Sequence, residues 1–221
     1  MEMTTAYAKM VAEKHSTRAF INRVVEKDTI WEILDEAARS TGTSRNAQEY
    51  KVYVTIGDKT ERIRSLYLKA DAENMSAISD LSAHRTGTWS QKAVAHRVAF
   101  DKSIRDFLGD DLGQYLNAQN TLFHAPALLV FTIPDMDNDW AIYDLGSFTQ
   151  SVQMSALARG VASVVAYSIV KYPQILRKEL LIPDEEHIII GIALGYPTDD
   201  KVNDFRTPRM AVEEYTKVYG E

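Results

Sequence analysis

The sequence predicts a single domain of the α+β class, in which helices and a sheet share one core. Its 221 residues fit one compact domain, and no repeat, low-complexity segment or linker divides them. Apolar residues recur at helical spacing over residues 30–38 and 140–159, which predicts two helices. Residues 50–56 alternate like a strand packed on one face. Residues 127–133 and 188–197 are apolar runs typical of buried strands.

The first part of the chain is predicted to form two helices, a loop and the strand at 50–56. An amphipathic helix opens the chain, and the second helix follows it. Asp28 and Thr29 can each cap that second helix, and Thr29 with Glu32 has the spacing of a capping box. The polar run at residues 40–48 then predicts a surface loop before the strand.

The middle of the chain is helical in pattern but interrupted. Within residues 59–116 the apolar spacing indicates more than one helix, with Gly87 and Gly109 as breaks. Trp89 lies in a polar segment of this region. It could form the wall of a ligand site, although packing at the edge of a core is the commoner place for a tryptophan.

The last third is predicted to contain one long helix, two strands and two short helices. The helix at 140–159 is apolar on several sides and should end at the glycine that follows it. Residues 161–166 are β-branched and predict a strand, and Pro173 suits the first turn of a short helix. In the tail, Thr207 as N-cap and Pro208 after it predict another short helix.

Composition excludes several kinds of site. The absence of cysteine excludes disulfides, thiolate nucleophiles, zinc–thiolate sites and iron–sulfur clusters. The net charge of -6 argues against nucleic acid or an anionic membrane as partner. No histidine pairing suits a metal, and the serine-hydrolase, P-loop and Rossmann motifs are missing. We see no signal peptide or membrane span and expect a cytoplasmic protein whose chemistry, if it is an enzyme, a cofactor carries.

Lys14, Ser16 and Arg18 place three hydrogen-bond donors within five residues near the N-terminus. From the residues alone, two interpretations are open. The cations could complement the C-terminal end of a helix in solvent. Alternatively, a point charge, a hydroxyl and a guanidinium fork could hold a phosphate and a polar ring. A protein of net negative charge needs such a local cluster to bind an anion.

The order of these features resembles the FMN-dependent nitroreductase family, and the resemblance covers nearly the whole chain. Residues 14–20, Lys-His-Ser-Thr-Arg-Ala-Phe, match the opening motif of that family. Asn46-Ala47-Gln48 matches part of its Ser-x-x-Asn-x-Gln-Pro-Trp loop. Residues 191–197 look like its late strand, and Arg206 and Arg209 fall where basic residues hold the FMN phosphate.

The resemblance implies a central, mostly antiparallel sheet flanked by helices in an intertwined homodimer. The helix at 140–159 would then supply part of the dimer interface, although a plain core helix fits its pattern equally well. The implied cofactor-binding residues are Lys14, His15, Ser16, Arg18, Thr43, Ser44, Arg45, Asn46, Val165, Ala166, Tyr167, Arg206 and Arg209.

Five of these residues are implied to hold the two ends of FMN. Lys14, Ser16 and Arg209 would bind the ribityl phosphate, and the choice between Arg209 and Arg206 stays open. Arg18 would lie beside the N1 and C2 edge of the isoalloxazine ring. A cation there stabilises the anionic reduced flavin and so raises its potential.

The remaining residues are implied to surround the ring. His15 would contribute mostly its backbone, and the backbone of residues 165–167 would approach flavin N5. Residues 43–46 would come from the partner subunit, because the family builds its flavin sites across the dimer interface. In the same loop, Glu49 and Tyr50 stand where the family has Pro-Trp, and the usual proline before the loop is absent.

The reaction implied is that of an NAD(P)H-dependent flavoprotein oxidoreductase. NADH or NADPH would reduce FMN at N5 and leave. A nitroaromatic, quinone or similar electron-poor acceptor would then bind the same face, in a ping-pong relay. The same flavin fold could instead carry enone reduction, dehalogenation or flavin breakdown, and a non-catalytic flavin-binding protein is an alternative of another class. The sequence leaves open the choice between NADH and NADPH, the physiological acceptor and the role of residues 59–116.

Overall fold

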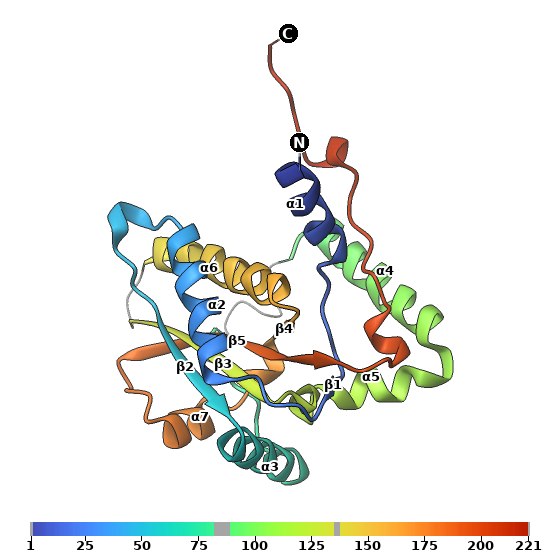
Figure 1. The fold of residues 1–221 in the computed structure, drawn as a ribbon. Coiled ribbons are helices and arrows are strands. Elements are labelled where there is room, and N and C mark those ends of the chain that lie inside the picture. Colours follow the sequence, from blue (N-terminus) through green and yellow to red (C-terminus); the bar gives the residue numbers. More distant parts are fainter. Residues whose placement is uncertain (1, 82–88, 135–137, 221) are drawn as a thin grey trace.

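The computed structural model describes residues 2–81, 89–134 and 138–220. For residues 2–4 it describes the backbone only. It has an antiparallel sheet at its centre with helices on both faces (Figure 1). The α+β class predicted from the sequence is therefore confirmed. The structure is of one chain, and the homodimer stays a prediction. Within the described part of the chain, no helix is both long and apolar enough to cross a membrane.

The sheet is organised around its last strand. Its order is β1-β5-β3-β2, and β4 also pairs with β5; every pairing is antiparallel. At 12 residues, β5 is long enough to pair with three strands. The strands are β1 (Phe20–Ile21), β2 (Lys51–Ile56), β3 (Ala127–Pro134), β4 (Ala162–Ala166) and β5 (Glu186–Pro197).

The predicted helices form close to their predicted positions. Gly109, with φ of +57°, separates α4 from the next helix, as its position in the sequence predicted. Gly160, with φ of +69°, follows the end of α6. The helices are α1 (Glu2–Glu13), α2 (Lys27–Ser40), α3 (Asp58–Ala72), α4 (Gln91–Leu108), α5 (Leu112–Ala118), α6 (Asp139–Ala158) and α7 (Pro173–Leu180), joined in places by short 3-10 turns.

Two apolar cores lie on opposite faces of the sheet. Helices α2 and α6 cover one face, where Ile33 and Val152 pack against Leu129 of β3. Helices α3 and α7 cover the other, where Tyr67 packs with Leu128. Because β3 is buried on both faces, its sequence is apolar apart from Thr132, whose hydroxyl donates to Glu186.

Helix α6 combines a buried face with an exposed end. Leu145 and Val152 are buried in the core, which agrees with a core helix. Trp140 and Tyr143, near the N-terminus of the helix, are mostly exposed. The expectation that this helix forms a dimer interface stays a prediction.

The predicted capping box of α2 is wrong. The helix begins at Lys27 with Glu26 as its N-cap, and no side chain caps it. Asp28 and Thr29 therefore lie inside the first turn. Val25, which is completely buried, fixes the chain just before the helix, so tertiary packing and not a local cap sets the start.

Two further predictions of local structure are wrong. Strand β2 is packed on both faces, because α3 covers the second one and the buried Thr55 hydroxyl pairs with that of Thr60 at 2.9 Å. In the tail, Thr207 does not begin a helix. The Arg209 guanidinium donates to the carbonyl oxygens of Thr207 and Pro208, at 2.9 and 3.2 Å, in place of helical N–H groups. A 3-10 turn at Val212–Glu214 is all that follows among the described tail residues.

Candidate functional site

The basic stretch, residues 14–20, crosses the molecule between α1 and β1. Lys14 still donates its backbone N–H to Met10 in the last turn of α1. Thr17 is buried, and its N–H donates to the carbonyl oxygen of Ser163 in β4 at 3.0 Å. Arg18 therefore lies well beyond the end of the helix, and a helix dipole cannot explain its position.

Phe20 anchors the end of the basic stretch in the sheet. Its backbone pairs with Pro197, and its ring is buried. The ring lies directly over Gly195, where a Cβ atom would come within 2.7 Å of the rings of both Phe20 and Pro126. Only glycine fits this position, so this glycine of the late strand serves the packing of the basic stretch.

Lys14 and Arg209 are near enough in the folded chain for their charges to interact. Burial, and after it the positive charge of Arg209, lowers the pKa of Lys14 below its ordinary value. Among the residues that the structure describes, no acidic side chain forms an ion pair with either cation, and Arg209 bonds only to tail carbonyls. Two interacting cations without an acidic partner suit an anionic ligand, and that they bind one stays a prediction.

Arg206 and Arg209 differ in their surroundings. The Arg206 guanidinium donates to the carbonyl oxygens of Asn203 and Phe205, at 2.7 and 3.4 Å. Its charge does not contribute to the lowered pKa of Lys14, whereas that of Arg209 does. Of the two tail arginines, Arg209 is thus the one whose charge acts on Lys14.

Arg18 is partly buried beside an aromatic ring. Its guanidinium carbon lies 5.5 Å from the centroid of Tyr115, and Nη1 donates to the Ser16 carbonyl oxygen at 3.1 Å. Burial lowers the pKa of Arg18, and the neighbouring Tyr115 opposes that shift. Nδ1 of His15 lies 2.7 Å from the Glu13 carbonyl oxygen, and the expectation that this residue contributes mostly its backbone stays a prediction.

The end of β4 lies next to the basic stretch. The hydrogen bond from Thr17 to Ser163 joins the two segments two residues before Val165. Val165 is exposed although it lies in a strand, and Ala166 and Tyr167 are partly buried. The structure therefore brings residues 165–167 into the neighbourhood of the predicted cation cluster.

The loop of residues 43–46 is not brought to the basic stretch within one chain. It lies at the upper left of Figure 1, beyond α2, with residues 14–20 on the other side of the sheet centre. Asp144 of α6 fixes the loop by accepting the N–H of Ser44 at 2.8 Å. Arg45 and Asn46 both have positive φ, which gives the loop a tight path. That the loop acts from a partner subunit stays a prediction.

Three residues that contact the predicted cofactor residues were not predicted from the sequence: Asp144, Tyr115 and Asn203. Asp144 could have been found, since it is a single acid on the buried face of an apolar helix. Tyr115 and Asn203 carry no comparable signal, because Tyr115 lies in the interrupted helical region and Asn203 in the polar tail. Their contacts with Arg18 come from tertiary structure alone.

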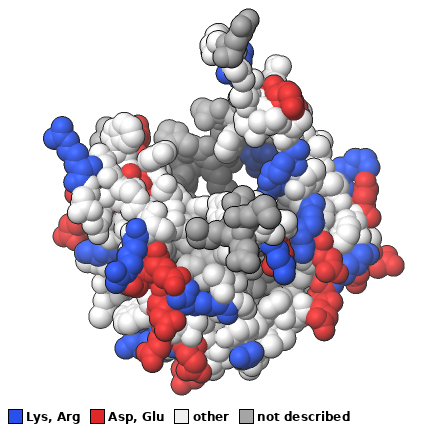
Figure 2. Space-filling view, turned by 45° about the horizontal axis from the view of Figure 1, so that its top comes forward, with Lys and Arg blue, Asp and Glu red and all other residues white. Residues whose placement is uncertain are grey.

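Basic side chains gather on one side of a hollow in the face shown in Figure 2, while acidic side chains are most frequent toward the rim. Two cavities border the predicted cofactor residues. One, of about 360 Å³, is lined by Arg18 together with Asn117 and His124. The other, of about 490 Å³, lies between Arg209 and His96 of α4.

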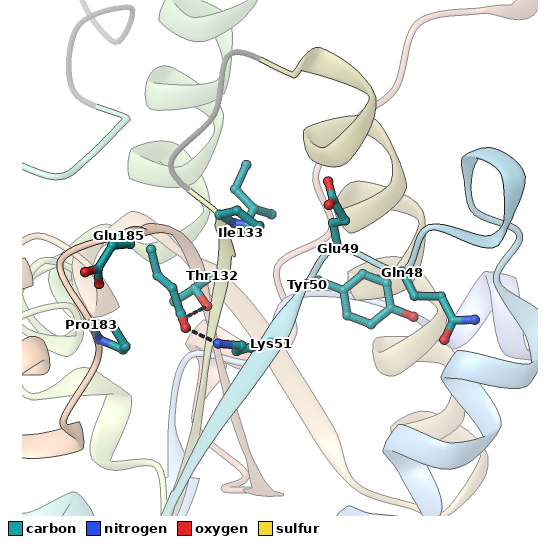
Figure 3. Close-up of a pocket in the computed structure, with 10 residues that line it drawn as sticks. Gln48, Glu49, Tyr50, Lys51, Thr132, Ile133, Pro183 and Glu185 are labelled. Atoms are coloured by element: carbon teal, nitrogen blue, oxygen red, sulfur yellow. Dashed lines mark hydrogen bonds and ion pairs between the residues drawn. The ribbon is translucent and has the colours of Figure 1, made fainter.

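A separate cavity of about 390 Å³ lies at the other end of the sheet, between β2, β3 and the segment before β5 (Figure 3). Its buried acid is Glu186, which accepts hydrogen bonds from Thr132 at 2.6 Å and Tyr53 at 3.0 Å and pairs with Lys51. Burial raises the pKa of Glu186, but these partners outweigh it and lower the pKa overall. None of the predicted cofactor residues lines this cavity, so it is distinct from the cation cluster and its ligand position.

The antiparallel sheet with helices on both faces places the chain in the α+β class. Residues 11–196 match the Nitroreductase family, and the chain belongs to this family. It is 26% identical over 228 residues to a 4-nitrobenzoate reductase of Pseudomonas putida, a match that covers 99% of this chain and 97% of that protein. It is also 26% identical over 224 residues to a chloronitrobenzene nitroreductase of Comamonas testosteroni, covering 96% of each.

Its fold matches that of a solved structure, the FMN-dependent nitroreductase NfnB from Mycobacterium smegmatis in complex with NADPH. The TM-score is 0.90 at 24% identity, over 99% of this chain and 100% of the other. The family and the sheet architecture predicted from the sequence are thus confirmed. The roles assigned to individual residues stay predictions.

Proposed function

We propose that this protein is an FMN-dependent nitroreductase that uses NADH or NADPH to reduce nitroaromatics, quinones or similar electron-poor acceptors. The observation that carries the proposal is the placement of Lys14 beside Arg209. The names of the relatives, which are reductases of nitroaromatic compounds, agree with it. So does the name of the structural neighbour, which is FMN-dependent and complexed with NADPH.

The phosphate of FMN suits the chemistry of this donor set. A dianion between Lys14 and Arg209 would offset their mutual repulsion and raise the pKa of Lys14 back toward its ordinary value. Ser16, partly buried between Lys14 and Arg18, adds a hydroxyl donor to the same segment. The fit therefore rests on charge as well as on the resemblance.

The polar edge of the ring suits Arg18. A partly buried guanidinium with one neutral carbonyl acceptor, that of Ser16, is costly unless further acceptors approach it. Ring oxygen and nitrogen atoms would supply such acceptors, and the fixed positive charge would favour the electron-rich form of the ring. Tyr115 holds the guanidinium from its other side.

When bound, FMN would supply the redox chemistry, taking up electrons from the nicotinamide at N5 and giving them to the acceptor. The chain would contribute binding and orientation. The exposed Val165 and the backbone of the two residues after it would form the wall beside the reacting face. Lys14 and Arg209 would fix the phosphate and thereby the position of the ring.

A homodimer completes this proposal. Apolar side chains stand exposed on α1, α4 and the tail: the exposed fraction is 64% for Tyr7, 64% for Val98 and 86% for Tyr219. Exposed apolar surface of this extent indicates an interface. A second copy would cover it and could bring its own residues 43–46 to the cofactor. In Figure 1 these elements project from the body of the molecule.

The test is to purify the protein and record its absorption spectrum and its NAD(P)H oxidation with 4-nitrobenzoate, a quinone and an activated enone. A flavin spectrum with steady turnover of the nitroaromatic or quinone is expected. Turnover of the enone alone would favour the alternative reaction in the same fold. Bound flavin without turnover of either nicotinamide would favour a flavin-binding protein without catalysis.

A further inference from the structure

The side chain of Asn203 joins the two ends of the chain beside the predicted phosphate site. Asn203 is 6% exposed. Its Oδ1 accepts the N–H groups of Arg18 and Ala19, at 2.7 and 3.2 Å. Its Nδ2 donates to the carbonyl oxygens of Ala19 and Thr198, at 2.9 and 3.0 Å. Both acceptor sites and both donors of the amide are therefore in use.

The tail is firmly attached where it carries Asn203. Val202 and Phe205, on either side, are buried in a small core with Ile104 and Leu108 of α4. The carbonyl oxygen of Asn203 also accepts the Arg206 guanidinium at 2.7 Å. The position of Asn203 is thus set by α4 and the tail, independently of the basic stretch.

The basic stretch needs such an attachment because its cations face another cation. Lys14 precedes Arg18 by four residues, and Arg209 follows Asn203 by six. Burial and, after it, the charge of Arg209 lower the pKa of Lys14, so the two like charges oppose each other in the free protein. Hydrogen bonds to the Arg18 backbone resist a displacement of one segment relative to the other.

We infer that Asn203 is a positioning residue of the phosphate site. Its amide fixes the position of the basic stretch, which carries Lys14, relative to the tail, which carries Arg209. Both cations can then face one dianion. The inference rests on the proposed FMN-binding function. Asn203 contacts backbone atoms and acts on the ligand only through the segments that it joins.

An amide is the side chain that this position requires. In Asn203→Asp the bonds to the N–H groups of Arg18 and Ala19 can persist, but a carboxylate oxygen would face the carbonyls of Ala19 and Thr198. In Asn203→Ala all four bonds are lost. Both variants should therefore let the basic stretch shift relative to the tail. Asn203→Ala does so without introducing a charge.

The test compares FMN with riboflavin, which has the same ring and no phosphate. Titrations of full-length wild type, Asn203→Ala and Asn203→Asp should show the dissociation constant for FMN rising about tenfold or more in the variants, the effect of one charged hydrogen bond. Riboflavin binding should change less, so the preference for FMN over riboflavin should shrink.

The matched control is Thr55→Val, which deletes a buried hydroxyl contact in β2. Strands β5 and β3 separate β2 from β1, so this variant should lower the unfolding temperature and leave the preference for FMN unchanged. A reduced preference in the control equal to that in the Asn203 variants would mean that destabilisation explains it, which would overturn the inference.

A preference for FMN that is unchanged in both Asn203 variants would also overturn the inference about Asn203. The proposed function would still hold in that case, provided that the wild type binds FMN. If the wild type binds neither flavin, the proposed function itself fails.

A measurement on the wild type needs no variant: FMN should slow hydrogen exchange of the Arg18 and Ala19 amides more than riboflavin does. Equal protection by the two flavins would contradict the inference.

Discussion

Lys14 and Arg209 come from opposite ends of the chain, and burial and, after it, the positive charge of Arg209 lower the pKa of Lys14. Holding two like charges together in this way costs free energy on folding. An arrangement of this kind is typical of functional sites, where a ligand supplies the missing opposite charge. The first two predictions follow from it.

Arg209→Ala should weaken FMN binding by about 1.5–3 kcal/mol, the value of a hydrogen bond to a charged group. Equilibrium dialysis or fluorescence titration measures this change. Arg206→Ala is the matched control, because its guanidinium is bound to the carbonyl oxygens of Asn203 and Phe205 and does not act on Lys14. Equal losses in the two variants would contradict the assignment of Arg209.

FMN binding should weaken as the pH rises into the alkaline range. The pKa of Lys14 is lowered in the free protein, and a bound dianion would raise it. Binding is then accompanied by proton uptake, so affinity is complete below the free-protein pKa and decreases above it. The dissociation constant measured against pH checks this. In Lys14→Met the dependence should flatten; a wild-type curve that is already flat would refute the role of Lys14.

Arg64 should be far more important for stability than its position in a surface helix indicates. Residues 122–124 all have positive φ, between 50° and 60°, and form a strained left-handed turn before β3. The buried guanidinium of Arg64 donates to Thr121 at 2.8 Å and Ala125 at 2.6 Å, the carbonyls on either side of that turn.

Arg64→Met should consequently lower the free energy of unfolding by about 2–4 kcal/mol, because one buried and one partly buried carbonyl group lose their donor. Urea unfolding with an unchanged m-value measures it. Arg62→Ala, two residues earlier in α3, removes an ion pair with Glu179 whose arginine is mostly exposed. That control should cost less than about 1 kcal/mol. A similar cost for both arginines would show that the turn does not depend on Arg64.

Sedimentation should show flavin-loaded protein only as a dimer. The tail carries the exposed side chains Tyr215, Val218 and Tyr219, which a second copy would cover. Truncation after Met210 should shift the protein toward monomer and reduce its flavin content together. A monomer that retains stoichiometric FMN would rule out a site shared between subunits.

Much of the fold could be predicted from the sequence because its elements carry strong periodic patterns. The mostly apolar run of β3 and the multi-sided apolar pattern of α6 each predicted an element that exists within a residue or two. Both patterns record burial directly. Gly109 and Gly160 marked element ends correctly, because each adopts a positive φ that glycine favours.

The failures concern positions where tertiary contacts outweighed local ones. Thr29 lost its capping role because the buried Val25 sets where the chain enters α2. The tail helix at Thr207 did not form because Arg209 occupies the carbonyls that it needed. The role of Asn203 could not be predicted for a related reason. Its partners are backbone atoms remote in sequence, and a sequence pattern does not indicate such contacts.

The pairing of Phe20 with Pro197 has a consequence for biosynthesis. Strand β1 pairs only with β5 in the described part of the sheet, so β1 has no strand to pair with until almost the whole chain has left the ribosome. Contacts of such sequence separation form late, after the loop between them has closed. The protein should therefore bind flavin only late in folding. A nascent chain that ends before β5 should bind none.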